Sequence, residues 1–298
     1  MKRTAILMMV LAGAVWAQTQ APSTPQPAAQ PQGSTAAATP APQPQGKLPP
    51  QAKTQEEYNA YQAAKQASTD AAAAEQVARD FAAKFPDSDL RVLLYRDAMH
   101  AFQKANNSDK MLEMGRLVLQ LEQDDPEAMI GVAEVLTERT RDTDLDKQQR
   151  IEEASKLAQK ALDSIDTGIV VPAGTPPETV AAYKSFLRSS AYAILGTQQF
   201  NQQKYKEAED YFRKSIDAYP SQLDPIVVLR LALALDNQKR YQDALQEAYK
   251  AVDLTTVDTP VGTYARQERD RLIQLTGGIV PPPEKPAAGT ATPAPPKN

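Results

Sequence analysis

The chain has 298 residues, with 33 Lys or Arg, 37 Asp or Glu, a single His and no Cys, which gives a net charge of −4. The lack of Cys excludes a fold held by disulfides. An acidic chain without a basic tract excludes nucleic acid as an expected partner, because phosphate binding depends on clustered Lys and Arg. The sequence contains no Gly-rich phosphate loop and no G-x-S-x-G motif, so we expect neither an enzyme nor a bound cofactor.

The first 17 residues have the pattern of a secretory signal peptide. Lys2 and Arg3 precede an apolar run that ends at Val15, and Val15-Trp16-Ala17 supplies small residues where signal peptidase recognises the chain. This run is shorter than the roughly 20 residues that span a bilayer. We therefore expect cleavage after Ala17, no membrane span afterwards, and export to the periplasm, with an outer-membrane-associated or extracellular location as alternatives.

Two segments are rich in Pro and Ala and flank the rest of the chain. Residues 18–50 consist mainly of Pro, Ala, Gln, Ser and Thr, and residues 279–298 repeat this composition. Such segments cannot bury enough apolar surface to offset the entropy of ordering. We expect a disordered linker before a folded region at residues 51–278 and a disordered tail after it.

The first half of the folded region predicts pairs of amphipathic helices. One pair runs from about Thr54 to Pro86 and a second from about Val92 to Asp125. A third pair begins at Asp125-Pro126-Glu127, where Asp suits the N-cap and Pro the first helical turn. About nine extra residues, 141–149, separate its two helices.

The extra residues contain the sharpest metal candidate in the chain. Its carboxylates follow the D-x-D-x-D spacing of a calcium loop and have an acidic residue at the twelfth position: Asp142, Asp144, Asp146 and Glu153. Lys147 stands where such a loop requires Gly. We therefore expect no metal, and interpret the cluster as an acidic approach to the next helix.

The second half continues the pattern. A loop over Thr167–Gly174 leads to Thr175-Pro176-Pro177-Glu178, which predicts a capping box and a long helix. Another pair begins at Asp224-Pro225, and a final helix from about Val261 to Leu275 ends at Gly277-Gly278, a helix-stop signal. This last helix is expected to cap the apolar end of the stack.

Residues 189–222 resemble the tetratricopeptide repeat, a helix-turn-helix unit of 34 residues. The resemblance rests on residues at the spacings of W-x2-L-G, A-x3-F and a closing Pro: Tyr192, Leu195, Gly196, Tyr205, Ala208, Phe212 and Pro220. It implies an all-α, right-handed α-solenoid of about five such repeats plus a C-terminal capping helix. The stretch Ala78–Phe102 also looks like repeats of outer-membrane assembly and Tol-associated proteins, which indicates the bacterial cell envelope.

The resemblance further implies that the first helix of each repeat lines a concave groove that binds proteins or peptides. The repeat register then selects candidate binding residues: Arg96, His100, Gln103, Lys104, Glu134, Glu138, Thr197, Asn201, Leu229, Leu233, Asp236 and Asn237. We expect a non-catalytic interaction module or assembly adaptor. Two alternatives stay open, a structural spacer acting through its Pro-rich tails and a hydrolase subunit on a helical-repeat scaffold. The sequence does not determine the partner or the oligomeric state.

Overall fold

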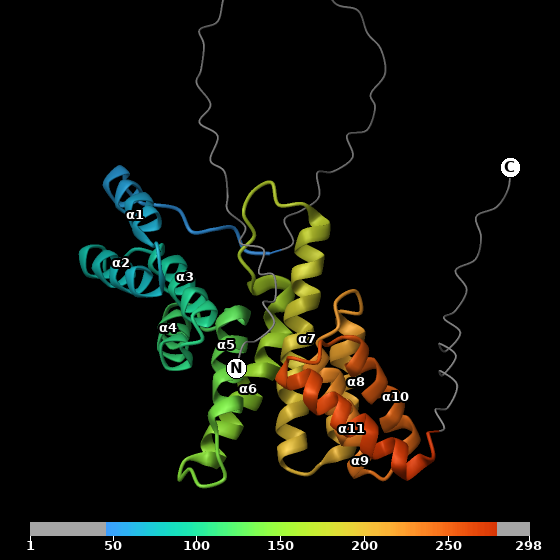
Figure 1. Ribbon diagram of the computed structural model, residues 1–298. Helices are drawn as coiled ribbons and strands as arrows, with labels where there is room; N and C mark the ends of the chain where they lie inside the picture. The colour runs from blue at the N-terminus through green and yellow to red at the C-terminus, as the bar shows by residue number, and fades with distance from the viewer. Residues whose placement is uncertain (1–45, 279–298) are drawn as a thin grey trace, which may run out of the picture.

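A computed structural model describes residues 46–278 as a row of packed helices (Figure 1). The expected signal peptide at 1–17, most of the predicted linker and the predicted tail at 279–298 lie outside these residues. In chain order the helices of the described part are α1 (Gln55–Ala67), α2 (Ala71–Lys84), α3 (Arg91–Lys104), α4 (Ser108–Leu121), α5 (Pro126–Arg139), α6 (Lys147–Gly168), α7 (Pro177–Asn201), α8 (Tyr205–Ala218), α9 (Pro225–Asn237), α10 (Tyr241–Asp253) and α11 (Pro260–Thr276).

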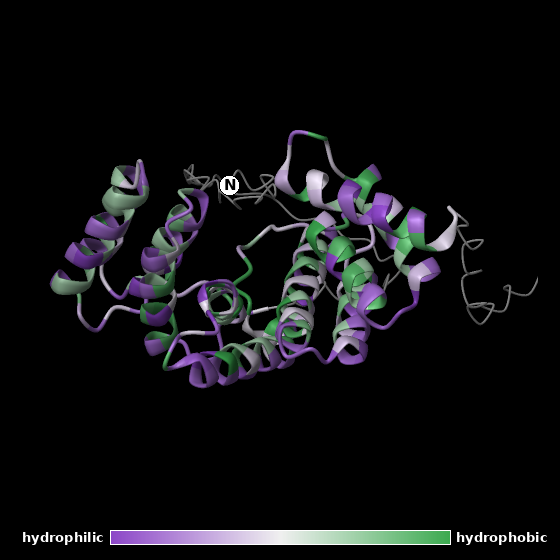
Figure 2. Cartoon of the chain, turned by 60° about the horizontal axis from the view of Figure 1, so that its bottom comes forward, coloured by the Kyte–Doolittle hydropathy of each residue, from purple (hydrophilic) through white to green (hydrophobic). Residues whose placement is uncertain are grey.

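Over residues 46–278 the fold is an all-α, right-handed solenoid of five helix-turn-helix units followed by the single helix α11. Each helix packs on its neighbours in the chain, and α5 also packs on α7. The buried residues form successive clusters rather than one centre: one joins α1–α4 and one side of α5, the next joins α5–α7, and two more join α8–α11. Apolar and hydrophilic residues alternate along the helices accordingly (Figure 2). Each unit therefore needs its neighbours to bury its apolar face.

The fourth unit, α7 and α8, shows how the repeat residues act. Phe212 and Ala208 are fully buried and Leu195 nearly so. A Cβ at Gly196 would lie 2.6 Å from Cδ1 of Phe212, so the glycine is what lets the ring pack against α7. Pro220 is exposed. It follows the end of α8 and does not pack between the helices, which corrects its assignment as a packing residue.

The helix ends confirm several sequence predictions and correct one. The carboxylates of Asp125 and Asp224 cap α5 and α9, accepting hydrogen bonds from the backbone N–H of Ala128 and Ile226. Gly277 ends α11 with a left-handed φ of 67°. The predicted capping box before α7 is wrong, because Pro176 occupies the N-cap and no side chain caps the helix. Proline fixes the backbone there in place of a side-chain hydrogen bond.

The predicted loop at Thr167–Gly174 starts too early, since α6 continues to Gly168. Residues 46–50, which composition assigned to the linker, are held against the folded part. The N–H of Lys47 donates to the carbonyl of Ile169 at 2.7 Å, and the N–H of Val171 donates to the carbonyl of Lys47 at 2.9 Å. The Lys47 ammonium also pairs with Asp124 at 2.9 Å. These long-range contacts have no signature in the composition of a Pro-rich segment.

Within residues 46–278, no helix combines the length and apolar character that crossing a bilayer requires.

Candidate functional site

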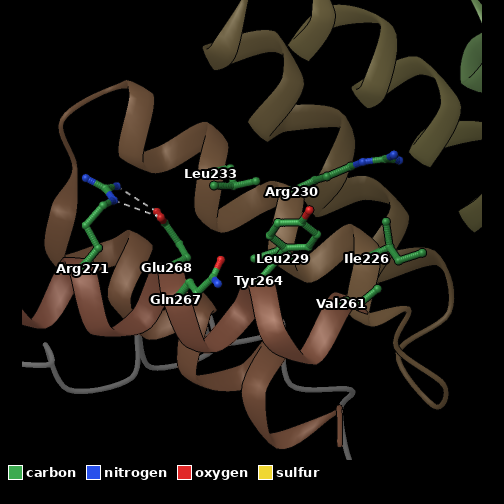
Figure 3. A pocket seen from close by; sticks show the side chains of 9 residues that line it. All are labelled: Ile226, Leu229, Arg230, Leu233, Val261, Tyr264, Gln267, Glu268 and Arg271. Carbon is green, nitrogen blue, oxygen red and sulfur yellow. Dashed lines mark hydrogen bonds and ion pairs between the residues drawn. The ribbon is translucent and has the colours of Figure 1, made fainter. Parts of the chain in front are cut away.

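The candidate site is a groove between α9 and α11, which we call the α9–α11 groove. It encloses about 490 Å³. Its lining residues are Ile226, Leu229, Arg230, Leu233, Val261, Tyr264, Gln267, Glu268 and Arg271. Figure 3 shows the aliphatic side chains and the Tyr264 ring gathered between the two helices. The groove is therefore mainly an apolar surface that the fold leaves open.

Helix α9 supplies one wall because its apolar residues are not confined to one stripe. Leu231 and Leu235 are buried in a cluster with residues of α8 and α10. Ile226, Leu229 and Leu233 recur at intervals of three and four on another side of the same helix and reach the groove. A helix that is apolar on two sides needs a second neighbour. Helix α11 covers this second side only in part.

Helix α11 supplies the opposite wall. Leu272 and Ala265 are fully buried and anchor the helix on the stack. Val261 and Tyr264 lie on the side toward α9, and Tyr264 remains 64% exposed. An aromatic ring with a polar tip and so much accessible surface is suited to a partner that covers its apolar body.

The charges at the groove are paired among themselves. Arg271 donates to both carboxylate oxygens of Glu268, at 3.0 and 3.1 Å, and pairs with Asp236 at 2.5 Å. These carboxylates raise the pKa of Arg271. Arg230 points away from the apolar side chains (Figure 3) and donates to Oγ1 of Thr197 at 2.9 Å. The apolar floor, rather than an unpaired charge, is thus the feature open to a ligand.

The structure brings only part of the predicted binding set to this groove. Leu229 and Leu233 line it, and Asp236 supports it through Arg271. Asn237 donates to the carbonyl of Leu233. Thr197 is buried and accepts the hydrogen bond from Arg230, so its hydroxyl holds α9 against α7.

Arg96, by contrast, is not available as a groove residue. It is 7% exposed and donates through Nε to the buried carboxylate of Asp125 at 3.0 Å, with a second bond from Nη2 to the same oxygen. Burial alone would lower the pKa of Arg96, but the negative charges of Asp125 and Glu127 have the larger effect and raise this pKa. Burial likewise raises the pKa of Asp125 against the pull of Arg96. The guanidinium joins α3 to the start of α5.

His100 belongs to the same network. Its Nε2 lies 3.3 Å from a carboxylate oxygen of Glu127, whose side chain is 10% exposed. Burial alone would raise the pKa of Glu127, but the hydrogen bond from His100 and the charge of Arg96 lower it to about 2. Tyr183 of α7 also bonds to Glu127, and burial raises the tyrosine pKa well above its usual value. Arg96, His100, Asp125, Glu127 and Tyr183 together form what we call the polar junction of α3, α5 and α7.

The remaining predicted residues are spread over separate helices. Lys104, Glu138 and Asn201 are exposed, and Gln103 and Glu134 are half-buried. None of the five lines the α9–α11 groove.

Sequence reasoning missed the α11 wall and most of the polar junction. The spacing that selected Leu229 and Leu233 also reaches back to Ile226 on the same helix face, so this residue could have been found. The pattern of α11 predicts a capping helix and gives no signal for Tyr264. Glu127 stands in a helix-start pattern, and its contact with Tyr183 depends on the packing of a helix more than 50 residues away.

The carboxylates of the suspected calcium loop are engaged by cations of the chain. Lys147 pairs with Asp142 at 2.8 Å, and Arg150 bonds to Asp146 at 2.7 Å. Among the described residues, no group of His, Cys, Asp or Glu is arranged to hold a metal ion.

No family model matches the chain, and no curated protein matches it. Comparison with solved structures finds tetratricopeptide-repeat (TPR) proteins at low identity. TTC0263, a thermophilic TPR protein of Thermus thermophilus, is 16% identical with a TM-score of 0.40, over 71% of this chain and 98% of its own. YrrB, described as a TPR protein with an unusual peptide-binding site, is 15% identical with a TM-score of 0.40, over 67% and 94%. MamA MSR-1 C2 is 18% identical with a TM-score of 0.42, over 64% and 89%. The fold assignment rests on the helix packing described above.

Proposed function

We propose that the chain is a non-catalytic protein-interaction module that binds a segment of another protein in the α9–α11 groove. The observation that carries this proposal is the exposed Tyr264 ring beside an aliphatic floor at the end of the stack. An apolar surface rimmed by paired charges is typical of a site for a protein partner. The solenoid serves as the rigid support for this site.

The groove has the size and chemistry for the apolar side chains of an extended peptide. Leu229, Leu233 and Val261 would remove these side chains from water, each full burial contributing about 1.5 to 3 kcal/mol. Tyr264 would cover the bound segment from the α11 side. Glu268 and Arg271 neutralise each other, so a charged group of a bound segment would be desolvated without a counter-ion. The site therefore favours an uncharged or weakly charged segment.

A peptide library displayed on phage tests the proposal without knowledge of the partner. We expect the intact chain to enrich peptides that share bulky apolar residues, and Leu233→Asp to bind these peptides at least tenfold more weakly. The matched control is Leu275→Asp, since Leu275 is 52% exposed on α11 but does not line the groove. Equal binding of the enriched peptides to wild type and Leu233→Asp would refute binding in this groove.

A hydrolase on the same scaffold would need carboxylates that converge on a substrate. Glu268 is the acidic residue that lines the groove, and both of its oxygens accept hydrogen bonds from Arg271. An engaged carboxylate among aliphatic side chains favours binding over catalysis.

We further propose that this binding takes place in the bacterial cell envelope. The support is the sequence pattern of residues 1–17, with its basic start, short apolar run and small residues before position 18. N-terminal sequencing of the protein from fractionated cells tests this. We expect a periplasmic fraction whose chain begins at Gln18, whereas a cytoplasmic protein that retains Lys2 and Arg3 would contradict export.

A further inference from the structure

The α9–α11 groove lies beside the point where the C-terminal segment leaves the folded part. Helix α11 forms one wall, and its last residue is Thr276. Gly277 and Gly278 both have left-handed φ values, 67° and 78°, and the N–H of Gly278 donates back to the carbonyl of Ile273. The chain is thus turned off the helix axis directly after the wall, and residues 279–298 follow.

The distance to the groove suits a tether of this length. Tyr264 precedes Thr276 by twelve helical residues, which corresponds to about 18 Å at about 1.5 Å per residue. About ten residues of extended chain span at most about 35 Å, so the ten residues that follow Thr276 are long enough to bring residues 286–296 to Tyr264. For a tether that can reach its site, the effective concentration of the tethered ligand is on the order of millimolar.

The composition of that segment matches the chemistry of the groove. Residues 286–296 read PAAGTATPAPP and contain no charged residue. Proline restricts the free chain toward an extended left-handed conformation, so less entropy is lost on binding than for a flexible peptide. Pro-rich segments dock through their rings on aromatic side chains. Tyr264, with Val261 beside it and Leu229 and Leu233 opposite, offers such a surface (Figure 3).

We infer that residues 286–296 of the same chain occupy the α9–α11 groove and compete with the outside partner. This inference rests on the proposed function, since it names a second occupant of the same site. The partner then binds only when it displaces the C-terminal segment. The Pro-rich residues before position 46 are the less suitable occupant, because the chain enters the fold at Lys47, which bonds to Ile169 and Val171, and none of these three residues lines the groove.

Photo-crosslinking of the full chain tests the occupancy directly. The photoreactive residue p-benzoylphenylalanine replaces Tyr264, and the crosslinked peptides are identified by mass spectrometry. We expect the crosslinks to concentrate in residues 286–296. When labelled and unlabelled protein are mixed, each crosslink should join residues of the same chain. The same replacement at Tyr58, an exposed tyrosine of α1, should give none to this segment.

A second variant separates specific docking from random collision of a tethered segment. In it, residues 281–298 are replaced by a Gly/Ser segment of equal length. We expect crosslinking from position 264 to fall at least fivefold and displayed peptides to bind about threefold to tenfold more tightly, because the competitor is lost. Crosslinks spread evenly over the tail, or unchanged in the Gly/Ser variant, would overturn the inference. If the peptides bind the full chain and the Gly/Ser variant equally, the groove retains its proposed function and only the competition is refuted. If the peptides bind neither protein, the proposed function fails. Crosslinking then still decides whether the segment occupies the groove.

Discussion

The polar junction and the α9–α11 groove differ in what they leave for a partner. In the polar junction, Arg96 and Glu127 are committed to bonds within the chain. In the groove, the charges are also paired, but Tyr264 is exposed and Leu233 and Val261 beside it are only partly buried. The same repeat register thus produces a structural joint at one place and a binding surface at the other.

The difference follows from the second helix that covers each place. Helix α7 starts well before its repeat and brings Tyr183 to Glu127, which closes the polar junction. Within the described residues, the fifth unit is followed only by α11, which covers part of α9 and leaves the rest accessible. Mutations in the junction should therefore change stability, and mutations in the groove should change binding.

The largest expected effect is the loss of the guanidinium at the polar junction. Arg96→Ala leaves the carboxylate of Asp125, which is 1% exposed, without its cation. We expect the free energy of unfolding to fall by about 3 to 5 kcal/mol, as for other buried ion pairs that lose one partner. Urea denaturation measures the change. Lys104→Ala on the same helix is exposed and should change stability by less than about 0.5 kcal/mol.

If Arg96→Ala were as stable as Lys104→Ala, the junction would not be structural. The complementary readout is binding: the folded fraction of Arg96→Ala should retain the displayed peptides with unchanged affinity.

The next effect is a pH dependence carried by Glu127. Its pKa is about 2 in the folded protein, below the ordinary value of 4.5. A depressed carboxyl pKa stabilises the fold above about pH 4.5, and this stabilisation is lost as the pH falls toward 2. At pH 7 we expect the free energy of unfolding of the wild type to exceed that of Glu127→Gln by on the order of 2 to 3 kcal/mol. The difference should shrink steadily between pH 4.5 and 2.

Urea denaturation of both proteins across this range tests the pH dependence, and the difference includes a change at Asp125, whose pKa burial and the charge of Glu127 raise. A constant difference between pH 7 and pH 2 would contradict the assigned role of Glu127.

How far the sequence predicted these two regions depends on the range of the contacts. The helix pairs, the cap at Asp125, the helix start at Asp224-Pro225 and the stop at Gly277 follow local patterns, and the structure contains them. Arg96 was misassigned to the groove because its partner Asp125 lies 29 residues away, in the next unit. A repeat register gives the side of a helix on which a residue lies, but the neighbouring unit decides whether that side is covered.

A smaller effect concerns α7 and α8, which connect the junction to the groove. Gly196→Ala would place a methyl group against the buried Phe212 ring. We expect the free energy of unfolding to fall by about 1 to 3 kcal/mol. Thermal or urea denaturation measures it. Adding Phe212→Leu should restore part of the loss by making room, and if the two changes were simply additive, the close contact would not be the cause.

The smallest stability effect and the largest binding effect are expected at the same residue. Tyr264→Ser removes a ring that is 64% exposed, so the free energy of unfolding should change by less than about 0.5 kcal/mol. The peptides selected by the intact chain should nevertheless bind at least tenfold more weakly, since aromatic residues at the centre of a site contribute about 2 kcal/mol or more. Tyr264→Phe keeps the ring and should retain most of the affinity. A loss of stability without a loss of binding would reverse the contrast, because Tyr264 would then belong with Arg96 among the residues that hold the helices together.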